Sequence, residues 1–150
     1  MSSLERAIAI AAEAHAGQHD KAGASYVLHP LRMMLRLTSN DERIVAALHD
    51  VCEDCPGWTF DRLRAEGFSE KILMALDTVT KRDGEAYEDF VRRAANNPIG
   101  RAVKLADLQD NCDLSRISKP SERDFERIEK YKRAIDLIGR LPSPEGQRDF

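Results

Sequence analysis

The sequence predicts an all-α fold, with one domain made of about seven helices joined by short loops. Apolar residues recur three and four positions apart along most of the chain, which is the pattern of a helix with one buried face. No sustained alternation of apolar and polar residues bounded by hairpin turns occurs in the sequence. Its 150 residues suffice for one hydrophobic core without disulfides or a structural metal.

The first two expected helices are separated by a loop. Ser2 and Glu5 have the spacing of a capping box, which places the start of the first helix there. Residues 18–25 contain a glycine and mixed charge, and Gly17 precedes them, so they predict a loop. Because proline suits the first turn of a helix, Pro30 predicts the start of the second helix, with His29 at its entrance. These helices are expected to end near Gly17 and Ser39.

Three more helices are expected in the middle of the chain. Ser39 and Glu42 have the spacing of a second capping box, and Pro56-Gly57 interrupts the helical pattern. Ser69 stands at an N-cap position before apolar residues at helical intervals. The expected helices cover residues 41–53, 59–66 and 69–79.

The last third of the chain is expected to hold three helices and a polar end. Proline at position 98 is again suited to a first helical turn, and it divides two apolar helical patterns. The expected helices run over 85–97, from Pro98 through Leu108, and from Ser121 to about Leu141. Residues 1–141 would then form the domain, and residues 142–150 a polar C-terminal tail.

Charge and cysteine content exclude several classes of protein. The 23 basic and 26 acidic side chains give a net charge of -3, so no broad positive surface for duplex nucleic acid is expected. The longest apolar stretch is too short to span a bilayer, and no membrane partner is expected. Three cysteines without a secretory segment indicate a reduced cytoplasmic protein. Cys52 and Cys55 are interpreted as free thiols, because no second pair completes a zinc site.

The segment from Leu48 to Asp54 carries most of the chemistry. On a helix, four polar side chains three and four positions apart would share one face: His49, Asp50, Glu53 and Asp54. Carboxylates gathered in this way repel one another, so a cation is the natural compensation. The alternatives are a His-Asp pair in a surface or capping role, and a solvated acidic helix end, although acids at that end oppose the helix dipole.

Two further residues are candidates to complete a metal site. His29 stands at a helix entrance, and Asp107 is a lone carboxylate in an otherwise apolar helix. Together with His49 and Asp50 they would offer two nitrogen and two oxygen ligands, which suit manganese, zinc or iron and leave positions for water and substrate. His15 and His19 are expected to lie outside this set, His15 satisfied by backbone groups and His19 in a solvated loop.

The ordered set of motifs resembles the HD superfamily of metal-dependent phosphohydrolases. More narrowly, it is similar to the hydrolase domain of RelA/SpoT proteins and to the stand-alone small alarmone hydrolases. The resemblance spans about residues 4–114. The segments that carry it are 14–18 (AHAGQ), 26–30 (YVLHP), 48–54 (LHDVCED), 79–81 (VTK) and 103–107 (VKLAD), followed by Asn111.

The resemblance implies an HD-type helical bundle that holds manganese and removes the 3′-pyrophosphate from guanosine tetra- or pentaphosphate, giving GDP or GTP and pyrophosphate. It assigns the metal to His29, His49, Asp50 and Asp107. It assigns Glu53 and Asp54 to orienting and activating the attacking water. The residues that it places near the nucleotide are Lys21 in the base-recognition loop, Asn111, and Lys81 or Lys104 beside the pyrophosphate, with a structural role as the alternative for Lys104.

The sequence departs from the alarmone-hydrolase pattern at two places, and other functions stay open. The chain has Asp20-Lys21 where that family usually has Arg-Lys, and 108–110 (LQD) where it tends to have Arg-Leu-His. An acid cannot make the cation-π contact of an arginine with a purine. The alternatives are a nucleotidase or phosphodiesterase with the same metal site, and a catalytically silent nucleotide-binding module. No synthetase region fits after Leu141, so the resemblance is expected to extend only to hydrolysis.

Overall fold

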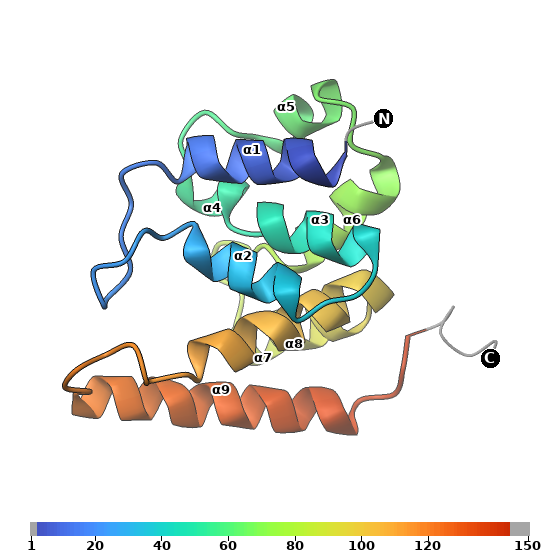
Figure 1. Cartoon of the computed structure of the whole chain (residues 1–150). Coiled ribbons are helices and arrows are strands. Elements are labelled where there is room, and N and C mark those ends of the chain that lie inside the picture. Colours follow the sequence, from blue (N-terminus) through green and yellow to red (C-terminus); the bar gives the residue numbers. More distant parts are fainter. Residues whose placement is uncertain (1–2, 145–150) are drawn as a thin grey trace.

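The computed structural model describes residues 3–144, and nearly all of its regular structure is helical (Figure 1). Among these residues the one strand-like pairing is an isolated bridge between His19 and Ser25. The all-α prediction is therefore confirmed. The helices are α1 (Leu4–Ala14), α2 (Leu28–Leu35), α3 (Asn40–Leu48), α4 (Val51–Asp54), α5 (Phe60–Ala65), α6 (Glu70–Thr78), α7 (Tyr87–Ala95), α8 (Pro98–Asn111) and α9 (Glu122–Arg140).

Serine and threonine caps define several helix starts, as the sequence indicated. Ser39 and Glu42 form a complete capping box at α3, and Ser69 accepts a hydrogen bond from the backbone of Ile72 at the start of α6. At α1 the cap is Ser3 and not the expected Ser2, which lies outside the described residues, as do residues 145–150 of the expected polar tail. α1 also ends at Ala14, three residues before the expected boundary.

The expected helix over residues 41–53 is wrong, because the chain forms two helices there. α3 ends at Leu48 and the short α4 begins at Val51. His49 Nδ1 donates a hydrogen bond to the carbonyl oxygen of Ala46 at 2.8 Å, and a continuing helix would give that oxygen to the backbone N–H of Asp50. Asp50 accordingly has φ −105° and ψ 0°, away from helical values.

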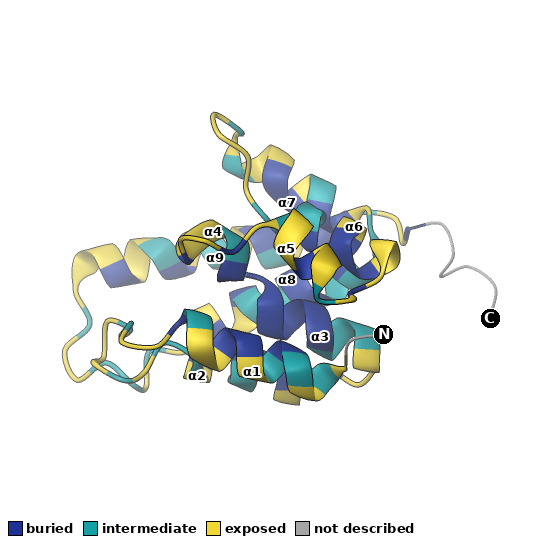
Figure 2. Ribbon diagram, turned by 90° about the horizontal axis from the view of Figure 1, so that it is seen from above, coloured by how far each residue is buried: buried dark blue, intermediate teal, exposed yellow. Residues whose placement is uncertain are grey.

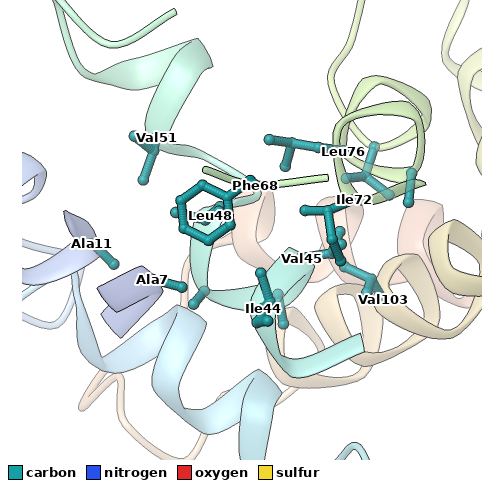
Figure 3. Packing of buried hydrophobic residues seen from close by; sticks show 14 of the residues in the cluster. Ala7, Ala11, Ile44, Val45, Leu48, Val51, Phe68, Ile72, Leu76 and Val103 are labelled. Carbon is teal, nitrogen blue, oxygen red and sulfur yellow. The ribbon is translucent and has the colours of Figure 1, made fainter. Parts of the chain in front are cut away.

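α3 lies at the centre of the larger core. Every residue from Ile44 to Leu48 is buried, and Figure 2 shows this helix as a dark segment surrounded by neighbouring helices. In the close view of Figure 3, Val45 and Leu48 meet apolar side chains of other helices, among them Ala7, Ala11, Ile72, Leu76 and Val103. Burying one such side chain stabilises the fold by about 1.5–3 kcal/mol. α3 is thus held on all sides.

A second, smaller core joins α7, α8 and α9. Its buried residues are Val91, Ala95, Leu108, Ala134 and Ile138. Arg101 on α8 secures the C-terminal end of α9 by donating hydrogen bonds to the carbonyl oxygens of Ile138, Leu141 and Pro142 at 2.5–2.8 Å. α8 therefore packs against α3 with one face and against α9 with another. Within the described residues, no helix is long and apolar enough to cross a membrane.

Candidate functional site

The break between α3 and α4 aims His49 into a buried polar cluster. Its ring is 4% exposed. Because Nδ1–H donates to Ala46, the second nitrogen, Nε2, is the one left to hold a second proton or a metal ion. Nε2 lies 2.9 Å from Asp50 Oδ2 and 3.7 Å from Asp107 Oδ1, yet among the described residues it has no hydrogen bond of acceptable geometry. The two carboxylates thus favour a positive charge at Nε2, carried by a proton or by a metal ion.

His29 approaches the same cluster from the first turn of α2. Its Nε2 lies 2.9 Å from Asp107 Oδ1, and the centroids of the His29 and His49 rings are 5.2 Å apart. Its Nδ1 lies 2.7 Å from Oδ2 of Asp110, a buried acid on α8. Burial lowers the pKa of His29, but the hydrogen bonds to Asp107 and Asp110 outweigh it, so that the pKa lies above its usual value.

Asp107 reaches the cluster from α8, where its neighbours hold its carboxylate. Lys104 Nζ lies 3.1 Å from Oδ2, and Asn111 Nδ2 donates to Oδ1 at 3.1 Å. Burial raises the pKa of Asp107, but Lys104 and the two histidines outweigh it and hold that pKa well below its usual range. Asp107 is therefore charged at neutral pH and faces both imidazoles.

The chemistry of this donor set fits a divalent metal ion. Ligand atoms of His29, His49 and Asp50 all lie within 4.8 Å of one another, and Asp107 Oδ1 reaches both rings. Burial lowers the pKa of His49, but the carboxylates of Asp50 and Asp107 outweigh it and raise that pKa well above its usual value. The cluster therefore attracts a positive charge to Nε2. Two imidazoles and two carboxylates suit manganese, zinc or iron.

Glu53 and Asp54 lie on α4 beside this cluster and line the same cavity as Asp50. Burial and the nearby charge of Asp50 raise the pKa of both carboxyls. A carboxylate with a raised pKa is a better proton acceptor than an ordinary one. Tyr26 closes the cluster by donating a short hydrogen bond to Asp50 Oδ2. The arrangement places two proton acceptors beside a candidate cation site.

A cavity of about 480 Å³ opens onto the cluster. It runs from Asp50 and Asp107 past the loop at residues 19–22 to α9. Sequence reasoning overlooked several polar residues that line it: Arg32, Asp113, Arg116, Asp124, Arg127 and Tyr131. Arg127 and Tyr131 are one turn apart on α9, but this spacing alone does not distinguish them from other charged and aromatic residues of that helix. Their place depends on how α9 packs across α8.

The four residues expected near the nucleotide lie in different environments. Lys21 and Asn111 line the cavity. Lys104 is buried, with Nζ 3.1 Å from Asp107 and 4.5 Å from the centre of the Phe90 ring, and it is not among the lining residues. Lys81 is exposed in the connection after α6 and does not line the cavity either.

The loop at residues 18–25 gives Asp20 a local structural role. Its Oδ1 accepts hydrogen bonds from the backbone N–H groups of Ala22 and Ala24, both at 2.9 Å. Bonds of this kind close an Asx turn, in which the acid stabilises the loop that carries Lys21. Asp20 also lines the cavity, so it places a negative charge there beside Lys21.

The cysteines and the remaining histidines lie outside the candidate metal cluster. Cys52, Cys55 and Cys112 are free thiols, as expected, and burial raises the pKa of Cys52 to about 11. His15 is buried, but a side chain and not the expected backbone group satisfies its Nδ1, which lies 2.8 Å from Gln18 Oε1. His19 is exposed at the mouth of the cavity.

Comparison with known proteins identifies related sequences, although no family model matches the chain. The chain is 32% identical over 132 residues to a guanosine-3′,5′-bis(diphosphate) 3′-pyrophosphohydrolase of Aquifex aeolicus. That alignment covers 80% of this chain and 19% of the relative. The chain is also 37% identical over 129 residues to the protein of the same name from Haemophilus influenzae. That alignment covers 76% of this chain and 19% of the relative. A probable GTP pyrophosphokinase of Mycobacterium leprae is 30% identical over 154 residues, in an alignment that covers 94% of this chain and 19% of the relative. The chain thus spans about a fifth of the length of these relatives.

A solved structure shares the fold. It is described as a metazoan ortholog of SpoT that hydrolyzes ppGpp, and it aligns with a TM-score of 0.73 and 19% identity. The alignment covers 93% of this chain and 86% of that one. At this identity the likeness concerns the fold, which agrees with the helical bundle expected from the sequence.

Proposed function

We propose that this chain, which is RelA/SpoT hydrolase-like in sequence and in fold, is a metal-dependent phosphohydrolase that removes the 3′-pyrophosphate from guanosine tetra- or pentaphosphate. One observation carries the proposal. His49 Nε2 is buried between the carboxylates of Asp50 and Asp107, which call for a positive charge at this nitrogen, and among the described residues it has no hydrogen bond of acceptable geometry. A bound cation removes this mismatch, and the cation would face an open cavity beside two proton-accepting carboxylates.

The proposed metal ligands are His29, His49, Asp50 and Asp107, with manganese as the expected ion and zinc or iron as alternatives. The donor set supports this choice, because imidazole and carboxylate groups bind all three ions. When bound, the ion activates water and offsets negative charge on the phosphoryl oxygens. The protein contributes by holding Nδ1 of both histidines as a donor, to Asp110 and to Ala46, so that Nε2 of each is the nitrogen left for the ion.

The chain's own residues would supply the remaining steps. Glu53 and Asp54 orient the attacking water and take up its proton, and their raised pKa values favour that task. Lys21, Asn111 and Arg127 line the cavity with donors for the nucleotide and its phosphates. The cavity volume of about 480 Å³ lies within the usual range for small-molecule sites. The substrate itself is proposed from the names of the relatives.

The domain would comprise residues 1–141 and act in the cytoplasm. Free thiols support a reducing compartment. A net charge of -3 supports a small nucleotide and not a duplex nucleic acid as the partner. Lys104, which is buried against Asp107, is proposed to support that ligand and not to bind substrate.

A second candidate function keeps the metal site and changes the substrate to another phosphorylated nucleotide. Asp20 favours this alternative, because its carboxylate lines the cavity beside Lys21 and cannot stack on a purine as an arginine does. The loop that holds Asp20 is closed by its own hydrogen bonds, so the charge stays at this position. The choice between the two substrates depends on how Asp20 and Lys21 contact the base of the nucleotide.

The deciding experiment is turnover of guanosine tetraphosphate against a panel of phosphorylated nucleotides, with added manganese and with chelator. Pyrophosphate and phosphate release are read separately. Manganese-dependent release of pyrophosphate from guanosine tetraphosphate is the expected result. Phosphate release from a different nucleotide, without activity on guanosine tetraphosphate, would replace the substrate and keep the site. Inactivity on the whole panel in metal-loaded protein would leave a nucleotide-binding module.

A further inference from the structure

Asp110 is a buried acid that the proposed reaction does not use. It lies on α8 one turn after Asp107, and it is 1% exposed. An isolated carboxylate in such a place would cost several kcal/mol, so its partners must compensate for it. Both oxygens are engaged: Oδ2 with His29 at 2.7 Å, and the pair Oδ1 and Oδ2 with Arg32 at 2.9 and 3.0 Å.

The contact with Asp110 fixes the tautomer of His29. A charged carboxylate accepts hydrogen bonds only, so His29 Nδ1 must be the donor. Nε2 lies 2.9 Å from Asp107 Oδ1, so it donates there while no metal is bound; a metal ion that takes the place of this proton would meet the lone pair of Nε2, while Nδ1–H stays on Asp110. His49 is fixed in the same tautomer by the neutral carbonyl group of Ala46. A carboxylate partner makes an imidazole more basic than a carbonyl partner does, so His29 becomes the stronger ligand.

Arg32 connects the same carboxylate to the cavity. Its Nε and Nη2 form the two-pronged pair with Asp110. Because the guanidinium is planar, Nη1 points away from that carboxylate, and among the described residues it has no hydrogen-bond partner. Arg32 lines the cavity together with Asp50 and Asp107. Two N–H groups are thus available there for an anion.

Arg116 completes the surroundings of Asp110 from the segment after α8. Its Nη2 lies 3.7 Å from Asp110 Oδ2 and donates to the Asp110 carbonyl oxygen at 3.3 Å. Two guanidinium groups therefore face one carboxylate. This excess of positive charge keeps Asp110 ionised in a buried position, so it can hold His29 and Arg32 at the same time.

We propose that Asp110 is a positioning residue that orients His29 toward the metal and Arg32 toward a phosphate group of the substrate. One buried carboxylate would then set both the affinity for the metal and the recognition of the anion. The proposal rests on the proposed function, because the anion at Arg32 is taken to be a phosphoryl oxygen of the nucleotide. Neither Asp110 nor Arg32 would touch the reacting bond.

The first test is the dissociation constant of Mn²⁺ for Asp110→Asn, measured without nucleotide by the electron paramagnetic resonance signal of free Mn²⁺. Asn keeps the shape of Asp and removes its charge, so affinity should fall by about 10- to 100-fold. Asp61→Asn is the control, since it removes an exposed acid on α5 that pairs with Arg64 and does not line the cavity. It should change affinity by less than about threefold. Equal losses in both variants would overturn the assignment.

The second test distinguishes the effect of Arg32 on anion binding from any effect on metal binding. Arg32→Gln leaves Asp110 with His29 and Arg116, so the dissociation constant of Mn²⁺ should stay within about threefold of the wild type. KM for guanosine tetraphosphate should rise by about tenfold or more while kcat changes less, because a charged contact with the substrate is lost. The calorimetric dissociation constant of inorganic pyrophosphate should rise in parallel. Unchanged pyrophosphate affinity would overturn this part of the proposal.

A third measurement needs no variant and covers the case in which Asp110→Asn does not fold. In the zinc-loaded wild-type protein, nitrogen-15 spectra of the imidazoles should show the proton of His29 on Nδ1, and a proton on Nε2 would refute the assignment. Metal affinity, pyrophosphate affinity and the tautomer are all read without turnover. An inactive wild-type protein would therefore overturn the proposed function while these three measurements still decide the role of Asp110.

Discussion

At the scale of single residues, the two nitrogens of His49 have different tasks. Nδ1 donates a hydrogen bond to a carbonyl oxygen of the helix that carries it, and Nε2 lies between two carboxylates. The contact of Nδ1 interrupts the helix between α3 and α4, and the position of Nε2 between two carboxylates favours a bound cation. One side chain thus sets both the local backbone and the chemistry, which explains why replacing it should affect both.

Replacing Glu53 by Gln should separate metal binding from turnover. The Glu53 side chain is outside the proposed ligand set, so Glu53→Gln should retain manganese after gel filtration, measured by elemental analysis. It should lose at least about 100-fold in kcat, because an amide cannot accept the proton. Glu129→Gln, which removes an exposed acid on α9 that does not line the cavity, serves as the control and should behave as the wild type. Full activity of Glu53→Gln would remove this residue from the mechanism.

Sequence reasoning found the residues of the cluster whose identity is part of a local motif. His29, His49, Asp50 and Asp107 come from three separate segments, and the structure brings them together. Sequence reasoning noted Asp110 only as part of a departure from the family pattern and did not single out Arg32, because no local pattern shows that these two side chains meet. Their role arises from the packing of α2 against α8, which brings together residues 78 positions apart. Long-range ion pairs of this kind have no periodic signal.

At the scale of elements, the close approach of α8 to α6 limits what position 100 can hold. A Cβ atom added at Gly100 would lie 2.2 Å from Thr78 Oγ1 and 3.0 Å from the carbonyl oxygen of Ala94. Gly100→Ala should therefore lower the free energy of unfolding by about 1–3 kcal/mol, measured by urea denaturation. The control is Gly139→Ala in α9, where nothing lies within 4 Å of the added atom. It should raise stability by about 0.5–1 kcal/mol, and equal effects would contradict the steric argument.

The connection between α6 and α7 depends on one arginine. Arg93 donates to the carbonyl oxygens of Asp77 and Thr80 and pairs with Glu85 at 2.9 Å. The hydrogen bond from Arg93 is the largest cause that lowers the pKa of Glu85, to about 2. This arginine therefore holds the loop and the start of α7 in one arrangement.

The pH dependence of stability should reveal this contact. Because the pKa of Glu85 is lower in the folded state, its ion pair stabilises the fold at pH values above the ordinary pKa of about 4.5. This stabilisation is lost as the pH falls toward the folded-state pKa of about 2. Urea denaturation between pH 5 and pH 3 should therefore show a steeper loss of stability in the wild type than in Glu85→Gln. Parallel curves for the two proteins would show that the ion pair does not contribute.

Helix positions were predictable because most helices bury an apolar stripe and several, such as α3, α6 and α9, start at a recognisable cap. The boundary inside 41–53 was not, because apolar residues continue across it and the break depends on a side-chain hydrogen bond. Hydrophobic periodicity indicates which face of a helix is buried. It does not show that a side chain can take a carbonyl oxygen away from the backbone N–H group that would bond to it in a continuous helix. The place where the prediction failed is the place where the proposed ligands lie.

At the scale of the whole molecule, the proposed metal would tie together α2, α8 and the junction of α3 with α4. A ligand that binds only the folded state stabilises it by about 2.7 kcal/mol at a concentration of 100 times its dissociation constant. Manganese should therefore raise the Tm of the wild type, and chelator should reverse the rise. His49→Ala and Asp50→Ala should show no such rise, measured by calorimetry. A manganese-dependent rise in either variant would remove that residue from the ligand set.

The central position of α3 has a consequence for how this protein can change during evolution. The helix that fills the middle of the core leads directly into His49 and Asp50, so its apolar residues and the polar cluster share one backbone. A substitution at Val45 or Leu48 that shifts this backbone slightly would also displace both polar groups. Such variants should lose activity before they lose the fold, so selection for chemistry would conserve these core positions more strictly than stability alone requires.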